Sequence, residues 1–193
     1  MGRWQPDARG RLAQAAAELY GERGYEATSV AHIAERAGLT ERTFFRHYAD
    51  KREVLFAGAS ELQDRLVSSV RDAPPAIGPL DAVALALETT GPFFEELGPI
   101  VGLRQSLIAA NPELQERELS KLAALAEALA AALRGRGVGD PTAGLAAEAG
   151  VAVFKVAFAR WVHNDSQATL AHTLRESFAE LHRVTAAQEP HPG

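Results

Sequence analysis

Thr28-Ser-Val-Ala-His-Ile-Ala-Glu-Arg-Ala-Gly-Leu-Thr-Glu-Arg-Thr-Phe-Phe-Arg-His-Tyr48 is a stretch whose apolar spacing predicts two short helices joined by a tight turn. The apolar residues that recur at intervals of three and four in the first helix are Val30, Ile33, Ala34 and Ala37. Gly38 ends that helix, because glycine reaches a positive φ without a clash at Cβ. Thr40 is placed to cap the second helix with its hydroxyl. The stretch therefore predicts a helix–turn–helix.

The second helix of this pair has two chemically different sides. Phe44 and Tyr48 share one side and predict a core face. The outward side carries Thr43, Phe45, Arg46 and His47. Hydroxyl, aromatic and cationic groups suit contact with a phosphate backbone and with base edges. Spacing alone does not decide that function, since any small helical protein offers apolar residues at helical spacing and a glycine between helices.

The residues on both sides of the stretch extend the pattern into a three-helix cluster followed by a fourth helix. From about Arg9 to Phe56 the sequence resembles the TetR family of bacterial transcriptional regulators. The segments that carry the resemblance are residues 16–19, 22–29, 33–40, 43–48 and 51–55. The resemblance covers roughly a quarter of the chain and implies a head that binds double-stranded DNA.

The resemblance also implies roles for single residues. It implies phosphate binding by Thr28 or Ser29, Thr40, Thr43 and the cation Lys51, and DNA-facing positions for Phe45, Arg46 and His47. This sequence departs from the family at three positions: Phe45 stands where tyrosine is common, Ala31 where a polar residue often reads a base, and Glu41 where lysine is common. We therefore expect base specificity to rest on Arg42 and Arg46.

Composition favours an all-α protein with no enzymatic activity. The chain has 193 residues, 47% of them hydrophobic, is rich in alanine and leucine, and has no cysteine. No uninterrupted apolar run approaches ~18 residues and no signal peptide opens the chain, so we expect a cytoplasmic protein without a membrane partner. The six histidines show no metal-binding spacing, and no nucleotide loop or nucleophile elbow occurs. No catalytic residue, metal or cofactor is predicted.

Charge is unevenly distributed along the chain. The net charge is −5, but residues 1–56 hold nine Lys and Arg against eight acids, which leaves −6 for the remainder. A head near +1 is a weak electrostatic signature for DNA, so the placement of individual cations has to carry that prediction.

The remaining sequence predicts a helical body, which brings the expected number of helices in the chain to about nine. Expected helices cover residues 7–23, 50–72 without interruption, 80–90, 99–110, 112–134, 142–163 and from 164–166 to 185, with a proline-rich linker at 73–79. Gly91-Pro92 predicts either a kink or a helix end. We expect a DNA-binding domain at residues 1–50, a ligand-binding and dimerisation domain at 51–187 and a disordered tail at 188–193.

The last two long helices are more apolar than the exterior of a monomer should be. Small residues such as Gly144, Ala147 and Gly150 allow close approach of another helix. The resemblance implies a homodimer through these helices, which would read a palindromic operator with half-sites ~34–36 Å apart. The alternative is that both helices only complete the core of the body.

A ligand site in the body is the least determined prediction. The candidate lining residues are Phe93, Phe94, Leu103, Arg104, Phe154, Phe158 and Trp161. An apolar pocket with one cation would suit a hydrophobic or acyl-type effector with an acidic group. The alternative is a filled core with Arg104 paired to Glu95, Glu96 or Glu148. The leading function is a ligand-released repressor; a ligand-independent regulator or activator and a small-molecule carrier remain open.

Overall fold

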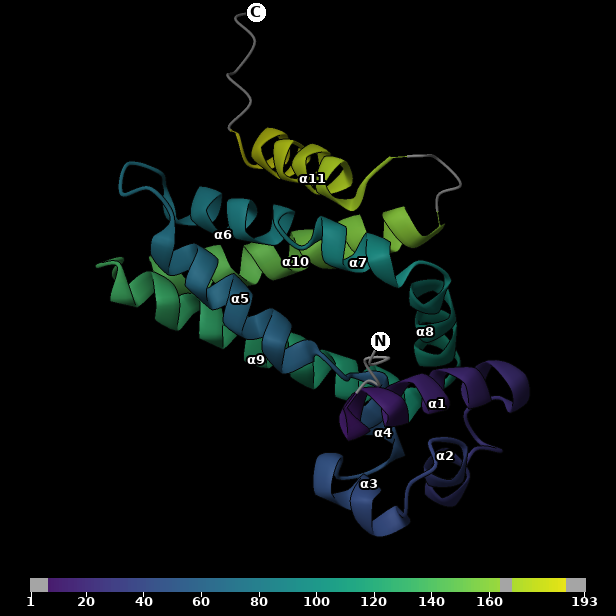
Figure 1. Cartoon of the computed structure of the whole chain (residues 1–193). Helices are drawn as coiled ribbons and strands as arrows, with labels where there is room; N and C mark the ends of the chain where they lie inside the picture. Colours follow the sequence, from purple (N-terminus) through teal and green to yellow (C-terminus); the bar gives the residue numbers. More distant parts are fainter. Residues whose placement is uncertain (1–6, 164–167, 187–193) are drawn as a thin grey trace, which may run out of the picture. The chain divides into compact units, whose positions relative to one another are not determined.

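The structure is a computed structural model that describes residues 7–163 and 168–186 (Figure 1). All regular structure in these ranges is helical, which confirms the all-α prediction. The helices are α1 (Ala8–Arg23), α2 (Val30–Arg36), α3 (Glu41–His47), α4 (Lys51–Leu55), α5 (Ala59–Asp72), α6 (Pro79–Glu88), α7 (Gly91–Leu97), α8 (Pro99–Ala110), α9 (Pro112–Gly135), α10 (Thr142–His163) and α11 (Leu170–Thr185).

The helix–turn–helix forms as its local chemistry predicts. The side chains of Ser29 and Thr40 accept hydrogen bonds from backbone N–H groups in the first turns of α2 and α3. Gly38 has φ +66°, and the N–H of Leu39 donates to the carbonyl of Ala34 at 2.8 Å, which closes the end of α2. Figure 1 shows α2 and α3 next to each other, packed on α1.

The predicted continuous helix over residues 50–72 is wrong, because the chain breaks between α4 and α5. Gly58 has φ +85°, a conformation that ends a helix, and Phe56 turns into the core of the head. The Gly91-Pro92 alternatives resolve as a break, since α6 ends at Glu88 and α7 begins at Gly91. These two breaks account for the helices beyond the nine expected.

The expected start of the last helix at residues 164–166 is also wrong. The helix begins at Leu170, where the Thr169 side chain accepts a hydrogen bond from the N–H of His172 at 3.2 Å. Asn164 to Ser166 lie outside the described residues, as does the tail at 188–193. A threonine directly before the first leucine of the apolar stripe is the better signal for the start of this helix.

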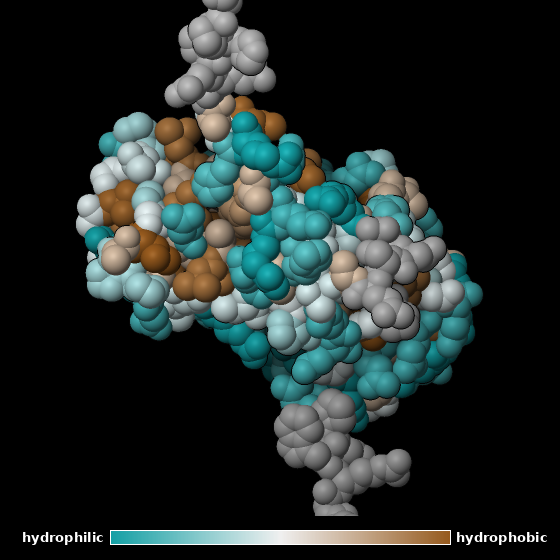
Figure 2. All heavy atoms as spheres, turned by 90° about the horizontal axis from the view of Figure 1, so that it is seen from above, coloured by the Kyte–Doolittle hydropathy of each residue, from teal (hydrophilic) through white to brown (hydrophobic). Residues whose placement is uncertain are grey.

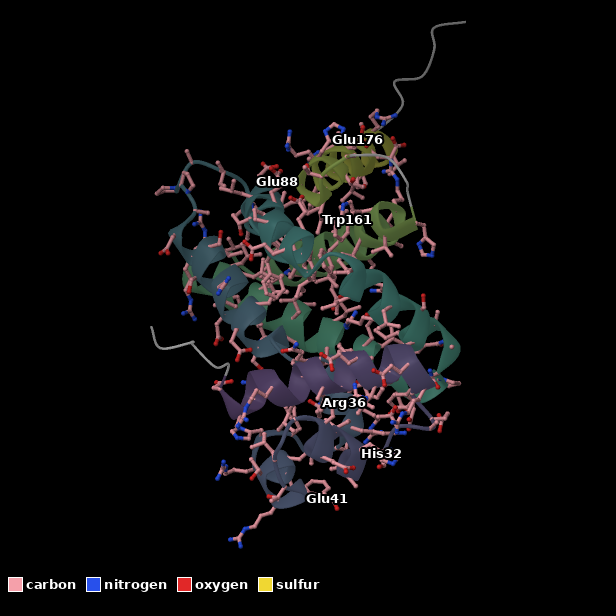
Figure 3. The ribbon with its side chains drawn as sticks, turned by 45° about the vertical axis from the view of Figure 1, so that its right-hand side comes forward. His32, Arg36, Glu41, Glu88, Trp161 and Glu176 are labelled. Atoms are coloured by element: carbon pink, nitrogen blue, oxygen red, sulfur yellow. The ribbon has the colours of Figure 1, made fainter. Side chains whose placement is uncertain are left out.

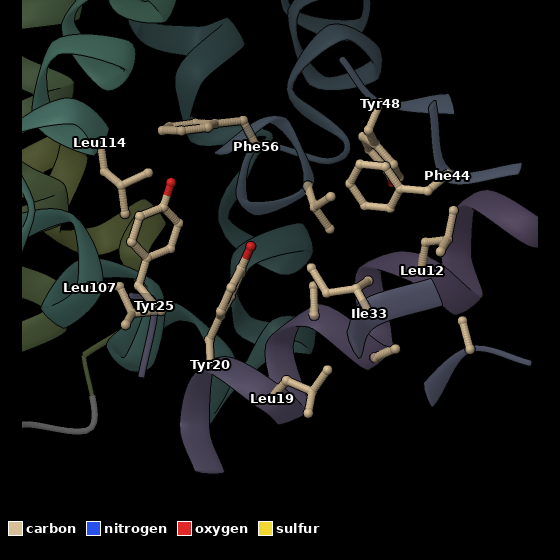
Figure 4. Close-up of a cluster of buried hydrophobic side chains, with 14 of the residues drawn as sticks. Leu12, Leu19, Tyr20, Tyr25, Ile33, Phe44, Tyr48, Phe56, Leu107 and Leu114 are labelled. Atoms are coloured by element: carbon tan, nitrogen blue, oxygen red, sulfur yellow. The ribbon is translucent and has the colours of Figure 1, made fainter. Parts of the chain in front are cut away.

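The chain divides into two compact units. The first comprises Met1–Ser60 and Pro99–Leu119, and its core joins the three head helices to α4, α8 and the start of α9 (Figure 4). The buried residues of this core include Leu12, Leu19, Tyr20, Tyr25, Ile33, Phe44, Tyr48, Phe56, Leu107, Ile108 and Leu114. The head expected at residues 1–50 is therefore packed with two segments that follow it in sequence.

The second unit comprises Glu61–Gly98 and Ser120–Gly193, and in it α6, α10 and α11 pack on one another. Gly150 makes the α6–α10 contact close, because a Cβ built there would lie 2.3 Å from Cγ1 of Val83. Helix α10 is long and apolar enough to cross a membrane by length and composition alone, with 44% of its apolar window buried. Core helices of soluble proteins pass the same test, and Glu148 and Lys155 interrupt this one.

Several large apolar side chains of the second unit remain at the surface. Figure 2 shows hydrophobic residues gathered on one side of the face that it presents, beside hydrophilic ones. The exposed large hydrophobic residues of this unit include Leu85, Leu97, Leu145, Val156 and Val184. Leu145 and Val156 lie on α10, three helical turns apart on one face.

Candidate nucleic-acid interface

Helix α3 holds its outward residues on a rigid support. Phe44 is fully buried and Tyr48 nearly so, and both belong to the head core. Phe45 points the other way and is 56% exposed, with its ring edge-on to that of Phe44 at a centroid distance of 5.5 Å. Because Phe44 anchors α3 in the core, Phe45 and the residues beside it face outward.

Two cations of α3 have no partner within the part of the chain that the structure describes. Arg42 and Arg46 are exposed, and no hydrogen bond or ion pair holds either guanidinium there. Both are therefore available for contact with a phosphate or a guanine edge. At the start of α3, the hydroxyls of Thr40 and Thr43 lie 3.1 Å apart and Thr43 N–H donates to Thr40 Oγ at 3.2 Å.

Arg36 on α2 is instead held by carboxylates. Its two terminal nitrogens each donate to Glu22 at 2.8 Å, and one also reaches Glu18 at 3.3 Å. The hydrogen bond from Arg36 holds the pKa of the Glu22 carboxyl below its ordinary value. Arg36 lies near His32 at the surface of the first unit (Figure 3).

Lys51 at the start of α4 is held inside the head. Its Nζ donates to the backbone carbonyls of Tyr25 at 3.0 Å and Thr28 at 3.2 Å, and lies 4.1 Å from the centroid of the Tyr25 ring. In this conformation Lys51 fastens the α1–α2 connection to α4. The phosphate contact expected for Lys51 would require it to give up both carbonyls.

Of the two alternative phosphate-binding residues, Thr28 and Ser29, only Ser29 is exposed at the surface. Thr28 is 1% exposed, and its hydroxyl donates to the carbonyl of Gly24 at 2.8 Å, so the phosphate role for Thr28 does not fit. Ser29 is exposed and forms a reciprocal cap with His32, whose Nδ1 accepts from Ser29 N–H at 3.3 Å. His47 is half-buried, and its Nε2 is enclosed without a partner among the described residues.

The seven residues predicted as a ligand site are divided between the two units. Five belong to the second unit and form a stacked aromatic cluster: Phe93, Phe94, Phe154, Phe158 and Trp161. Neighbouring rings in this cluster have centroid distances between 4.9 Å, for Phe94 and Phe158, and 6.0 Å, for Phe94 and Phe154.

Leu103 and Arg104 belong to the first unit. Leu103 packs against the head core, and Arg104 donates to the Leu55 carbonyl at 3.3 Å and to Glu118 at 3.1 Å. The Arg104 guanidinium also lies 4.9 Å from the centroid of the Phe56 ring, and burial lowers its pKa. The pairing of Arg104 with Glu95, Glu96 or Glu148 is therefore wrong, because Glu118 holds that position. Sequence spacing gave no signal for an ion pair between α8 and α9.

No group of three His, Cys, Asp or Glu that could hold a metal ion occurs within residues 7–163 and 168–186.

Comparison with known proteins matches both parts of the chain. Residues 12–57 match the profile described as "Bacterial regulatory proteins, tetR family", and residues 77–186 match that of the "MftR C-terminal domain". TcmR of Streptomyces glaucescens, an HTH-type transcriptional regulator, is 33% identical over 115 residues, which are 60% of this chain and 50% of TcmR. The regulator MftR of Mycobacterium tuberculosis is 27% identical over 169 residues, 86% of this chain and 85% of MftR.

A solved structure has the same fold. FadR of Thermus thermophilus, described as a TetR family transcriptional repressor in complex with lauroyl-CoA, superposes with a TM-score of 0.60 at 23% identity. The match covers 96% of this chain and 99% of FadR. The aligned segment spans half the length of TcmR and most of the length of MftR. Since one profile covers the helix–turn–helix and the other covers more than half of the chain, this protein belongs to the TetR family of bacterial regulatory proteins.

Proposed function

We propose that this protein is a cytoplasmic homodimeric repressor that binds a palindromic operator and leaves it when a small hydrophobic or acyl-type ligand binds. The observation that carries the proposal is the outward side of α3, where Arg42, Phe45 and Arg46 are exposed. The two arginines have no partner within the described residues, whereas Arg36 and Lys51 are engaged by the protein itself.

The proposed contacts with DNA fall into two kinds. Ser29, Thr40 and Thr43 lie at the starts of α2 and α3 and suit phosphate contacts, which position the head. Arg42 and Arg46 suit guanine edges, and Phe45 suits an apolar contact such as a thymine methyl. His47 lies at the end of α3 beside them.

The proposed dimer uses α10 and α11. The exposed side of α10 carries a stripe of small and apolar residues at helical spacing, with Glu148, Lys155 and Arg160 on its flanks: Leu145, Ala152, Val156 and Ala159. Val184 is exposed on α11. A two-fold partner would bury this face and hold two heads at the spacing of adjacent half-sites, ~34–36 Å.

The proposed ligand site is the aromatic cluster of the second unit. FadR is described with lauroyl-CoA, and an apolar aromatic lining suits a ligand of that hydrophobic kind. A ligand releases DNA only if it binds the free and the DNA-bound forms with different affinity. Close ring packing within the cluster favours a second candidate, a regulator that needs no ligand.

The experiment that tests the proposal selects binding sites from random duplex DNA and then measures affinity at fixed salt. We expect a palindrome, and we expect Arg46→Ala to weaken binding by about 30-fold or more, since the dimer loses two bidentate arginine–guanine contacts of ~1–3 kcal/mol each. Arg71→Ala, an exposed arginine on α5 outside both proposed interfaces, is the control and should bind as the wild type does. Unchanged operator affinity of the Arg46 variant would refute the assignment of α3 as the helix that contacts DNA bases.

Native mass spectrometry of the purified protein separates the two candidates. A dimer that carries a retained small molecule supports the ligand-released repressor. A dimer whose operator affinity does not respond to any acyl or hydrophobic compound that raises its melting temperature supports the ligand-independent regulator.

A further inference from the structure

The two carboxylate oxygens of Asp50 have separate partners. Oδ1 accepts hydrogen bonds from the backbone N–H groups of Arg52 at 2.8 Å and Glu53 at 3.1 Å, which caps α4. Oδ2 accepts two hydrogen bonds from the Arg52 side chain, from Nε at 2.9 Å and from Nη2 at 2.6 Å. One residue thus caps a helix with one oxygen and holds an arginine with the other.

This pair lies at the start of α4, which follows α3 directly in the chain. Only Tyr48, Ala49 and Asp50 separate α3 from α4. Lys51 turns into the head, so Arg52 is the cation at this junction that faces solvent, with 44% of its side chain exposed against 35% for Asp50. Burial opposes ionisation of Asp50, but hydrogen bonds from Arg52 and from the N–H of Glu53 outweigh it and hold the pKa of the carboxyl below its ordinary value.

We infer that Arg52 is a further phosphate-binding residue of the interface, and that Asp50 competes with DNA for its guanidinium and so lowers operator affinity. The inference rests on the proposed DNA-binding function. It assigns Asp50 a second role besides capping α4. In the free protein the Asp50 carboxylate binds the Arg52 guanidinium, and in the complex a phosphate oxygen of the DNA replaces that carboxylate.

Counterion release makes this exchange measurable. A cation that neutralises a phosphate releases about 0.9 counterion in B-DNA, and each such contact steepens the fall of affinity with salt by the same amount. In the wild type, Arg52 leaves Asp50 unpaired when it moves to a phosphate, and the exposed carboxylate then attracts cations, which offsets part of the counterion release. Without the Asp50 charge this offset is absent.

Asp50→Asn separates the two roles of Asp50. Asparagine keeps an oxygen to cap α4 and is as good a cap as aspartate, but it removes the charge that holds Arg52. Exposed ion pairs shift an equilibrium by up to about fivefold each. With two pairs in a dimer, we expect the variant to bind the selected operator about three- to twentyfold more tightly at 0.1 M salt. The salt slope should steepen by up to about 0.9 per subunit, or about 1.8 per dimer.

The double variant Asp50→Asn with Arg52→Gln tests whether Arg52 carries the gain. We expect it to return affinity and salt slope to within about twofold of the wild-type values. Glu127→Gln is the matched control, because it also removes one carboxylate from an exposed ion pair, that with Arg134 at 2.5 Å in the second unit, where Asp140 still holds Arg134 at 3.3 Å. That variant should change neither quantity.

Two results would overturn the inference: wild-type affinity and slope in Asp50→Asn, or a gain that persists when Arg52 is also replaced. Asp50→Ser, another strong cap without a charge, repeats the test if the asparagine variant melts lower than the wild type. Failure of the proposed function looks different, since the wild type itself would then select no operator.

Discussion

Gly150 of α10 is the glycine whose replacement by alanine should destabilise the second unit most. It is buried, and a Cβ built on it lies 2.3 Å from Cγ1 and 3.4 Å from Cβ of Val83 on α6. Val83 is itself fully buried, and a β-branched side chain in a helix has one strongly preferred rotamer. The methyl group can therefore enter only if α6 and α10 move apart.

The magnitude follows from two opposing effects. Overpacking a well-filled core costs ~1–3 kcal/mol, whereas replacing a helical glycine by alanine gains ~1 kcal/mol through helix propensity. Gly150→Ala should thus lower the free energy of unfolding by up to ~2 kcal/mol. Gly102→Ala in α8 is the matched control, since nothing lies within 4 Å of its Cβ position, and only the propensity gain applies there.

Thermal unfolding at one fixed protein concentration measures the difference, because dimerisation makes the melting temperature depend on concentration. For a chain of this size 1 kcal/mol corresponds to ~2–4 °C, so the Gly150 variant should melt ~2–12 °C below the Gly102 variant. Adding Val83→Ala to Gly150→Ala restores the space, and the double variant should be more stable than the sum of the single effects predicts. Equal melting temperatures for the two glycine variants would show that α6 and α10 do not meet as described.

Three further predictions concern the first unit and the end of α5. Lys51→Met leaves two backbone carbonyls of the α1–α2 connection without their donor and should lower the free energy of unfolding by ~1–3 kcal/mol, measured by urea unfolding. An unchanged urea midpoint would contradict the hydrogen bonds from Lys51 Nζ to these carbonyls. Arg136→Met removes the donors to four carbonyls at the end of α5, so amide hydrogen exchange there should accelerate, and wild-type exchange would contradict the capping role. The hydrogen bond from Arg36 lowers the pKa of Glu22 in the folded protein, so the Glu22 carboxylate stabilises the fold above its ordinary pKa of 4.5 and does so less as the pH falls below that value. The difference in melting temperature between the wild type and Glu22→Gln should therefore shrink below pH 4.5. A difference that stays constant with pH would contradict this role of Glu22.

Local signals in the sequence predict the helix–turn–helix closely, because each rests on residues near each other in the chain. Ser29 and Thr40 cap the helices as expected, and Gly38 takes the positive φ that the turn needs. The break after α4 was missed because the apolar stripe continues through it in phase. Only Gly58 marks the break, and a single glycine inside an apolar pattern is compatible with an unbroken helix.

Contacts between distant segments account for what the sequence could not predict. Lys51 has the residue type and position of a phosphate ligand, and its capture by two carbonyls depends on where the α1–α2 connection lies in space. Arg104 likewise finds Leu55 and Glu118 through the packing of α8 on the head core. Residue type predicts that a cation needs a partner, whereas only the fold determines which partner is nearest.

The distribution of engaged and unengaged cations bears on how this head would discriminate its operator from other DNA. If Arg42 and Arg46 of each subunit are the cations that meet the DNA, a dimer brings four of them, and its salt slope is no steeper than about −3.6, the value if all four neutralise phosphates. Between 50 and 200 mM salt, such a dimer loses at most about 150-fold in affinity, against about 10³–10⁵-fold for proteins with six to ten phosphate contacts. Non-specific binding is almost wholly electrostatic, so a head that pairs Arg36 and Arg52 with its own carboxylates binds random DNA weakly. The exposed side of α3 then contributes a larger share of the total binding free energy, and the ratio of operator to non-specific affinity rises even though the head carries almost no net charge.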